Sequence, residues 1–429
     1  MSAVRNYAVV TASYMSFTLT DGAIRMLVLL HFYQLGYTPF TLAFLFLLYE
    51  TAGIFANLGG GWLALRFGIP RMLAIGLTLQ IGGLLMLSGL QPDWSATASV
   101  AWVVIAQGIA GVAKDLTKTA SKSAIKATSQ DGAGQLFKWV AWFTGSKNAM
   151  KGFGFFVGGA LLQFVGFRPA LWLMAAMLVV VLTGVTLSLP RTLGKAKASK
   201  SFRELFAKTR PINLLAAARI VLFGSRDVWF VVGLPVFLYA NGWKYMAVSG
   251  FLAAWTIGYG GVQALAPSVI RRSPDGLSRE VPEARLWGAV LTAIPVILAL
   301  VLFTGIGRPD LVLVVGLAIF GFAFAVISSL HSYLILAYAG SEKAAEDVGF
   351  YYAANAAGRL IGILLSGILV QAGGIQACLW GSAAMLGICL ATTMLLPASR
   401  DQTPRDQTPR DQPRPAARTA PVTKDATLA

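Results

Sequence analysis

Residues 143–159 read FTGSKNAMKGFGFFVGG and lie inside an apolar stretch that is long enough to cross a membrane. Lys147 and Lys151 are four residues apart, so on a helix both ammonium groups lie on one face. A cation at the centre of a bilayer costs about 2.5–3.5 kcal/mol on insertion scales. Two such lysines predict that something anionic meets them inside the membrane.

The composition of the whole chain agrees with that setting. Of its 429 residues, 56% are hydrophobic and only 12% are charged, whereas soluble domains carry roughly 25% charged residues. Apolar stretches of about 20 residues, the length of a membrane-crossing helix, recur along the sequence. We predict an all-α polytopic membrane protein with twelve spans, near 6–34, 38–65, 70–90, 97–120, 138–165, 168–189, 211–240, 244–270, 285–304, 309–337, 344–371 and 374–396.

The net charge of +17 follows this topology. With both termini in the cytoplasm, twenty-six of the 35 lysines and arginines fall in cytoplasmic segments, three in outside loops and six within spans. This asymmetry is the positive-inside rule. It predicts a multi-pass protein of the inner (plasma) membrane with both termini cytoplasmic, and it argues against nucleic acid as a partner.

A basic segment divides the twelve spans into two sets of six. We expect an N-terminal six-helix half at 1–189, a cytoplasmic linker at 190–210 and a C-terminal six-helix half at 211–396. The remainder, 397–429, is rich in Pro, Arg, Asp and Gln, and we expect a disordered cytoplasmic tail because it has little apolar area to bury.

The two halves look like repeats of one another. Shifts of 206 and 208 residues align span 1 with span 7 and span 5 with span 11. The most informative match is an intramembrane cation in both halves. The aligned pairs are Asp21/Asp227, Tyr33/Tyr239, Gly36/Gly242, Lys151/Arg359, Gly154/Gly362, Gly159/Gly367 and Gly166/Gly374.

This plan resembles the major facilitator superfamily, whose signature between spans 2 and 3 is partly present in GGGWLALRFGIPRML (59–73). Leu65 stands where that signature has an aspartate, and Val104 stands where the span-4 signature has an arginine. These departures weigh against an ordinary proton-coupled drug antiporter. The matching positions are Gly61, Arg66, Gly68, Arg71, Gln107, Gly108 and Gly111.

Ionisable groups within spans are expensive and therefore mark candidate sites. Asp21 and Arg25 are spaced to pair locally, and Arg226 has Asp227 beside it. Six cations clearly within spans exceed three anions, so a multivalent anion would balance the cluster. The candidate substrate contacts are Arg25, Lys114, Lys118, Lys147, Lys151, Arg226, Asn355 and Arg359; the candidates for ion pairing or coupling are Asp21, Glu50 and Asp227.

Some of these side chains also have a structural interpretation. Lys114 and Lys118, which flank Asp115, could lie at the cytoplasmic end of span 4 and reach the interface there. We expect Arg219 to lie near the cytoplasmic face in a structural role, and His31 and His331 to be packed or interfacial. The glycines of GFGFFVGG and GILLSG are expected where the two halves meet.

Three segments resemble the ArsJ family of organoarsenical efflux permeases: 13–40, 108–126 and 136–159. The most specific signals are TLTDGAIRMLVLLHF, AKDLTK and GSKNAMKG, and the likeness covers residues 1–396. The resemblance implies export of 1-arseno-3-phosphoglycerate, which a cytosolic glyceraldehyde-3-phosphate dehydrogenase makes from arsenate. Hydrolysis outside the cell would then release arsenate, so that export confers arsenate resistance.

For that substrate we expect two cationic clusters, with Lys147, Lys151 and Arg359 on one oxyanion and Arg25 with Arg226 on the other.

We expect a monomer that is not an enzyme and needs no cofactor. The two cysteines are eleven residues apart, about 16 Å on a helix, which predicts no metal site between them. Uniport and proton antiport both stay open. The alternatives are an organophosphate/phosphate antiporter, another efflux permease of the superfamily, or a membrane sensor that binds an anion without moving it.

Overall fold

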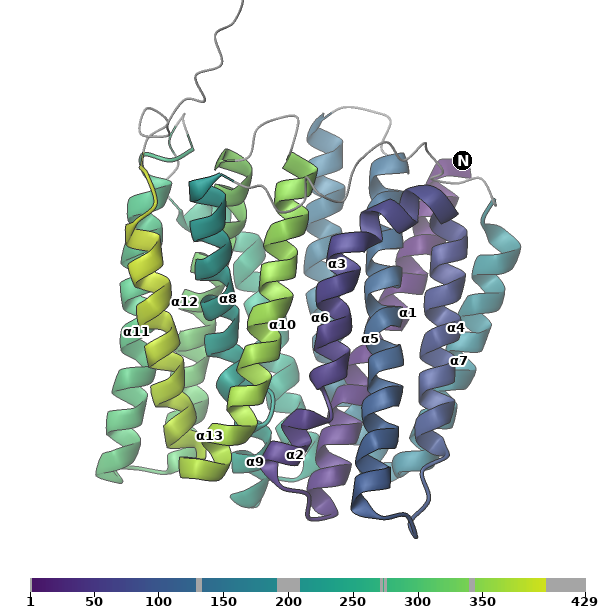
Figure 1. Cartoon of the computed structure of the whole chain (residues 1–429), viewed down its shortest axis with the longest axis horizontal. Helices are drawn as coiled ribbons and strands as arrows, with labels where there is room; N and C mark the ends of the chain where they lie inside the picture. The colour runs from purple at the N-terminus through teal and green to yellow at the C-terminus, as the bar shows by residue number, and fades with distance from the viewer. Residues whose placement is uncertain are drawn as a thin grey trace, which may run out of the picture.

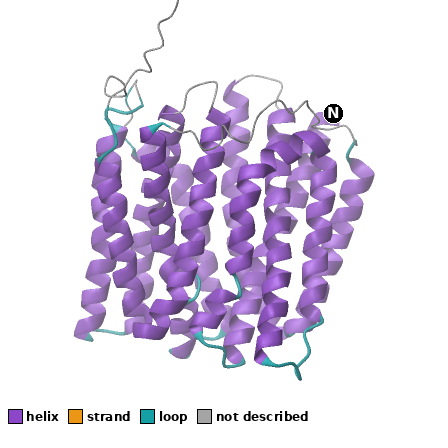
Figure 2. Ribbon diagram, viewed as in Figure 1, coloured by secondary structure: helices purple, strands orange, loops and turns teal. Residues whose placement is uncertain are grey.

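The computed structural model describes residues 2–128, 133–190, 209–270, 273, 276–338 and 344–398. Figures 1 and 2 show helices that run side by side along one direction, with short connections at both ends. The part of the chain that the structure describes contains helices, turns and loops without a strand. The helices are α1 (Ser2–Gln34), α2 (Pro39–Phe44), α3 (Leu47–Phe67), α4 (Ile69–Ser88), α5 (Ala96–Thr128), α6 (Ala133–Phe164), α7 (Phe167–Ser188), α8 (Arg210–Phe230), α9 (Gly233–Ala240), α10 (Tyr245–Val269), α11 (Glu280–Thr304), α12 (Pro309–Tyr338) and α13 (Ala344–Met394).

These helices form the twelve predicted spans in two halves. α2 with α3, and α8 with α9, each form one span with a break in it, while α13 contains two spans that meet at Gly373 and Gly374. By length and hydropathy alone, eight helices among the described residues are able to cross a membrane. The predicted linker at 190–210 and tail at 397–429 lie almost entirely outside the described residues.

Glycines in the tight turns confirm the internal repeat. Gly36 after span 1 and Gly242 after span 7 have φ angles of 84° and 85°, a backbone region that L side chains rarely adopt. Gly166 after span 5 and Gly374 after span 11 likewise have positive φ, 88° and 63°. The same backbone turn therefore recurs at both pairs that the sequence alignment had matched.

A second set of glycines lets helices touch within each half. A Cβ on Gly22 of α1 would lie 2.6 Å from the carbonyl oxygen of Lys151 on α6, and one on Gly154 would collide with the carbonyl of Leu19. In the C-terminal half, a Cβ on Gly362 of α13 would lie 2.6 Å from the carbonyl oxygen of Gly224 on α8. Span 5 thus contacts span 1 as span 11 contacts span 7.

The two halves meet through α6 against α10 and through α13 against α2 and α3. A Cβ on Gly159 would collide with Ser249 of α10, and a Cβ on Gly367 would lie 2.9 Å from Pro39 and Phe40 of α2. The expectation that these glycines lie between the halves is confirmed for Gly152, Gly159 and Gly367. It is wrong for Gly154, Gly158 and Gly362, which face helices of their own half because they lie on the other side of α6 and α13.

We predict that Gly154→Ala lowers the midpoint of thermal unfolding in detergent by several degrees, because the added methyl group forces α1 and α6 apart. Alanine is the better helix former by roughly 0.5–1 kcal/mol, so a rise is expected wherever space is open. Gly184→Ala on α7, where nothing lies within 4 Å, is the matched control and should keep or raise the midpoint. Equal behaviour of the two variants would contradict the close contact.

Candidate anion-binding site

A network of charged side chains joins six helices near the middle of the bundle. α1, α3, α5 and α6 contribute from the N-terminal half, and α8 and α13 from the C-terminal half (Figure 1). Its carboxylates are almost wholly buried, whereas several of its cations are partly exposed. The members are Asp21, Glu50, Asp115, Asp227, Arg25, Lys114, Lys118, Lys151, Arg226 and Arg359.

Glu50 is the centre of this network. Its carboxylate is 1% exposed and accepts hydrogen bonds from Arg25 at 2.6 Å and Arg359 at 2.7 Å. The Lys114 ammonium lies 3.9 Å from its other oxygen. The two bonds from Arg25 and Arg359 are charge-assisted, and such short bonds are among the stronger ones in proteins. Three cations from three helices thus converge on one acid.

The repeat extends to the ion pairs. In the N-terminal half Lys151 lies 3.9 Å from Asp21, and in the C-terminal half Arg359 donates to Asp227 at 3.2 Å. Both the cations and the acids were matched by the sequence alignment. The two pairs differ in one respect, since the guanidinium of Arg359 also reaches Glu50 and thereby ties the halves together.

The acids have further partners. Arg226 donates from Nε to its neighbour Asp227 at 2.6 Å, one of the two acids that the sequence left open for it, the other being Glu50. The Tyr49 hydroxyl donates to Asp21. The expected local pair of Asp21 with Arg25 is not the one that forms, because Arg25 turns toward Glu50 and packs over the rings of Phe46 and Tyr49, 5.3 and 5.2 Å from their centroids.

Lys114 and Lys118 are both members of the network. α5 continues to Thr128, beyond the predicted limit of span 4, so both lysines lie well inside the helix. Their ammonium groups lie 3.7 and 3.1 Å from the carboxylate of Asp115. Asp115 was not among the residues predicted to form the site, although its spacing of three from Lys118 is that of an ion pair on one helix face.

Tyr49 was missed altogether. Besides its bond to Asp21, its ring lies 3.9 Å from the Lys114 ammonium, so it joins α1, α3 and α5. Its position next to Glu50 was the only hint in the sequence. Arg219, for which the sequence suggested a structural role, is 4% exposed and buried in the C-terminal half.

Two other candidates flank the network. Lys147 is half-buried one turn before Lys151 and has an interaction of its own. Asn355 lies one turn before Arg359, and its buried Oδ1 has no hydrogen-bond partner among the described residues. Counted by formal charge, six cations and four carboxylates among the described residues leave the network with a surplus of two positive charges.

No comparable cluster of metal-binding or thiol side chains is present among the described residues. The described residues contain no group of three or more His, Cys, Asp or Glu side chains that could hold a metal ion. Cys378 and Cys389 are buried free thiols.

The family follows from comparison with known proteins. A model described as Major Facilitator Superfamily matches residues 8–346 and 283–427. The chain belongs to the major facilitator superfamily. A crystal structure of the nucleoside transporter NupG superposes with a TM-score of 0.68 at 15% sequence identity, covering 92% of this chain and 99% of that one. At this identity the likeness shows the fold alone. No curated protein matches the chain.

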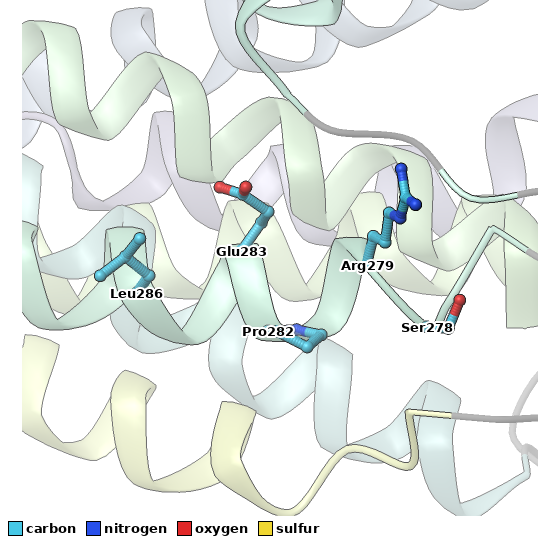
Figure 3. A pocket seen from close by; sticks show the side chains of 5 residues that line it. All are labelled: Ser278, Arg279, Pro282, Glu283 and Leu286. Atoms are coloured by element: carbon cyan, nitrogen blue, oxygen red, sulfur yellow. The ribbon is translucent and has the colours of Figure 1, made fainter.

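The structure also has a surface hollow beside the start of α11 (Figure 3). It is lined by Ser278, Arg279, Pro282, Glu283 and Leu286, all from α11 and the turn before it. α11 contributes no side chain to the network, so the hollow and the network are separate features.

We predict that Glu50→Gln destabilises the protein, because it removes the carboxylate that Arg25 pairs with. Breaking a buried pair costs about 3–5 kcal/mol by leaving a charge uncompensated. The measurement is the midpoint of thermal unfolding. In the double variant Glu50→Gln, Arg25→Gln most of the loss should be recovered, since Arg359 keeps Asp227. Losses that simply add would contradict the pairing.

Proposed function

We propose that this transporter exports a multivalent organic anion across the inner membrane, with both termini cytoplasmic, and that the anion is 1-arseno-3-phosphoglycerate. The transporter class follows from the superfamily. The substrate rests on the resemblance to the organoarsenical efflux permeases together with the surplus positive charge in the network. Export of this compound would confer resistance to arsenate.

One observation supports the proposal: within the described residues, two ammonium groups donate no hydrogen bond to a carboxylate. Lys114 and Lys151 are 15% and 21% exposed, and their nearest carboxylate oxygens lie 3.7 and 3.9 Å away. These distances give electrostatic attraction without a hydrogen bond. An ammonium group has three N–H donors, so both lysines are suited to receive the oxygens of a phosphate or arsenate ester.

The geometry revises the roles expected from the sequence. Arg25 is 5% exposed and bonded to Glu50, so we assign it to positioning that acid. Arg359 is committed to Glu50 and Asp227. We therefore propose Lys151, with Lys147, for one oxyanion of the substrate, and Lys114, with Lys118, for the other.

A substrate with an anionic group at each end suits this arrangement. Arsenite is neutral near pH 7 and would not require the cations, while free arsenate has only one oxyanion. Rocking of the two halves about the central network would expose the site to each side in turn. The membrane potential, negative inside, favours exit of an anion by about 2.3 kcal/mol per charge per 100 mV. We expect a monomer that depends on the cytosolic dehydrogenase for its substrate.

An organophosphate/phosphate antiporter is the second candidate, because the same lysines would bind any phosphate ester. Counterflow distinguishes the two functions. Vesicles that hold an exchanger and are preloaded with 3-phosphoglycerate should take up labelled glycerol phosphates, whichever way the protein is oriented in them. Vesicles that hold the proposed exporter should not.

We predict that inverted vesicles holding the protein accumulate labelled arsenic only when the dehydrogenase, NAD and glyceraldehyde-3-phosphate are supplied outside together with labelled arsenate. Lys114→Gln and Lys151→Gln should each lower the initial rate at least tenfold, since each removes donors to an oxyanion. Lys244→Gln, at an exposed position before α10, is the matched control and should transport normally.

Two results would overturn the proposal. Arsenic uptake without the dehydrogenase would mean that arsenate itself is carried. Normal rates in both lysine variants would remove these lysines from the substrate path.

A further inference from the structure

A second buried cation lies in the C-terminal half, outside the network. Arg219 on α8 is 4% exposed and precedes Arg226 by seven residues, about 10 Å along the helix. Phe223 lies between them: its ring centroid is 4.0 Å from the Arg219 guanidinium and 5.0 Å from that of Arg226. The two guanidinium groups therefore share one aromatic ring.

Arg219 differs from the other buried arginines in its partners. Arg25, Arg226 and Arg359 each bond to a carboxylate. Arg219 instead donates from one Nη to the carbonyl and hydroxyl oxygens of Ser328, both at 3.1 Å, and its Nε has no partner in the described chain. Among the described residues it has no carboxylate within 4 Å. A buried charge without a counter-charge is unfavourable.

The groups around Arg219 are neutral and able to donate. On α12, His331 is 0% exposed, and its two ring nitrogens have no hydrogen-bond partner among the residues the structure describes. The Tyr259 hydroxyl and the Gln263 amide of α10 both reach the Ser328 hydroxyl, at 3.4 and 3.3 Å. The Tyr351 ring of α13 stacks 4.7 Å from the guanidinium. An imidazole has at least one N–H to donate, and His331 lies one helical turn after Ser328 on α12. The guanidinium and the imidazole therefore lie on either side of Ser328, and neither has a carboxylate within 4 Å among the described residues.

We infer that Arg219, His331 and Ser328 form a second oxyanion-binding site in the C-terminal half, for the phosphate-type group of the substrate. The inference rests on the proposed function for the identity of the substrate but not for the site itself. Because Phe223 joins Arg219 to Arg226, the site is one step from the network along α8, toward the end of the bundle that holds the N-terminus (Figure 1). An anion would bind there before or after it occupies the central lysines.

The test measures binding of inorganic phosphate to the purified full-length protein by the rise in its unfolding midpoint, with chloride at equal ionic strength as reference. Lys114→Gln, Lys151→Gln serves as the background, so that the central lysines do not contribute. We expect a saturable phosphate response in this background, and at least tenfold weaker binding once Arg219→Gln is added. Arg308→Gln, at an exposed arginine outside the bundle, should leave the response unchanged.

A merely structural Arg219 behaves differently. In that case Arg219→Gln would lower the unfolding midpoint and leave the phosphate response intact, and this result would overturn the inference. A Lys114→Gln, Lys151→Gln variant that shows no phosphate response at all would also overturn it. If Arg219→Gln does not fold, His331→Leu replaces it: this change leaves the Ser328 bonds in place and should weaken phosphate binding several-fold, and unaltered binding would overturn the site.

The two proposals fail separately. Vesicles that take up no organoarsenical, while phosphate still stabilises through Arg219, would remove the substrate and keep the site. Vesicles that take up organoarsenical, while Arg219→Gln binds phosphate normally, would remove the site and keep the function.

Discussion

Glu50 is a buried carboxylate of the N-terminal half that holds Arg359 of the C-terminal half at 2.7 Å, and the centre of the protein is arranged around that bond. Removing two charges from water is costly, and their attraction compensates only when the geometry is good and the other hydrogen-bonding positions are filled. Arg25 donates to the same Glu50 oxygen, the Lys114 ammonium lies 3.9 Å from the other oxygen, and Asp227 accepts a second hydrogen bond from Arg359. A transporter whose halves rock must weaken this bond, so any ligand that competes for Arg359 or Glu50 acts on the conformational change directly.

The twofold repeat explains why the network has this form. An acid on span 1 or 7 pairs with a cation on span 5 or 11, and glycines at equivalent positions bring those helices together. The cations differ, however. The guanidinium of Arg359 is a planar fork that serves two acids at once, while the ammonium of Lys151 is a point charge that serves one. The two repeats therefore differ: the arginine ties the halves together, whereas Lys151 lies 3.9 Å from a single acid of its own half.

Comparison with other proteins places this chain in a superfamily and leaves its substrate to the site. The fold is shared with transporters of unrelated solutes, so it says little about what is carried. The distribution of charge says more. Arginines that bond to buried carboxylates stabilise the bundle, whereas partly exposed lysines with unused donors, and a buried arginine without an acid, are expected to attract an anion.

The membrane fold, the twelve spans and the repeat could be predicted from the sequence, because hydropathy, charge asymmetry and glycine spacing are local or periodic properties. The same reasoning found Lys151, Arg359, Asp21 and Asp227, since charges within spans are rare. It could not find which charges pair. Arg25 was free by spacing to bond to Asp21, but packing of α3 against α5 places Glu50 and Tyr49 of α3 within reach of Arg25. The burial of Arg219 likewise depends on α10, α12 and α13 enclosing α8. Partners from distant parts of the chain are chosen by tertiary packing, which local pattern does not contain.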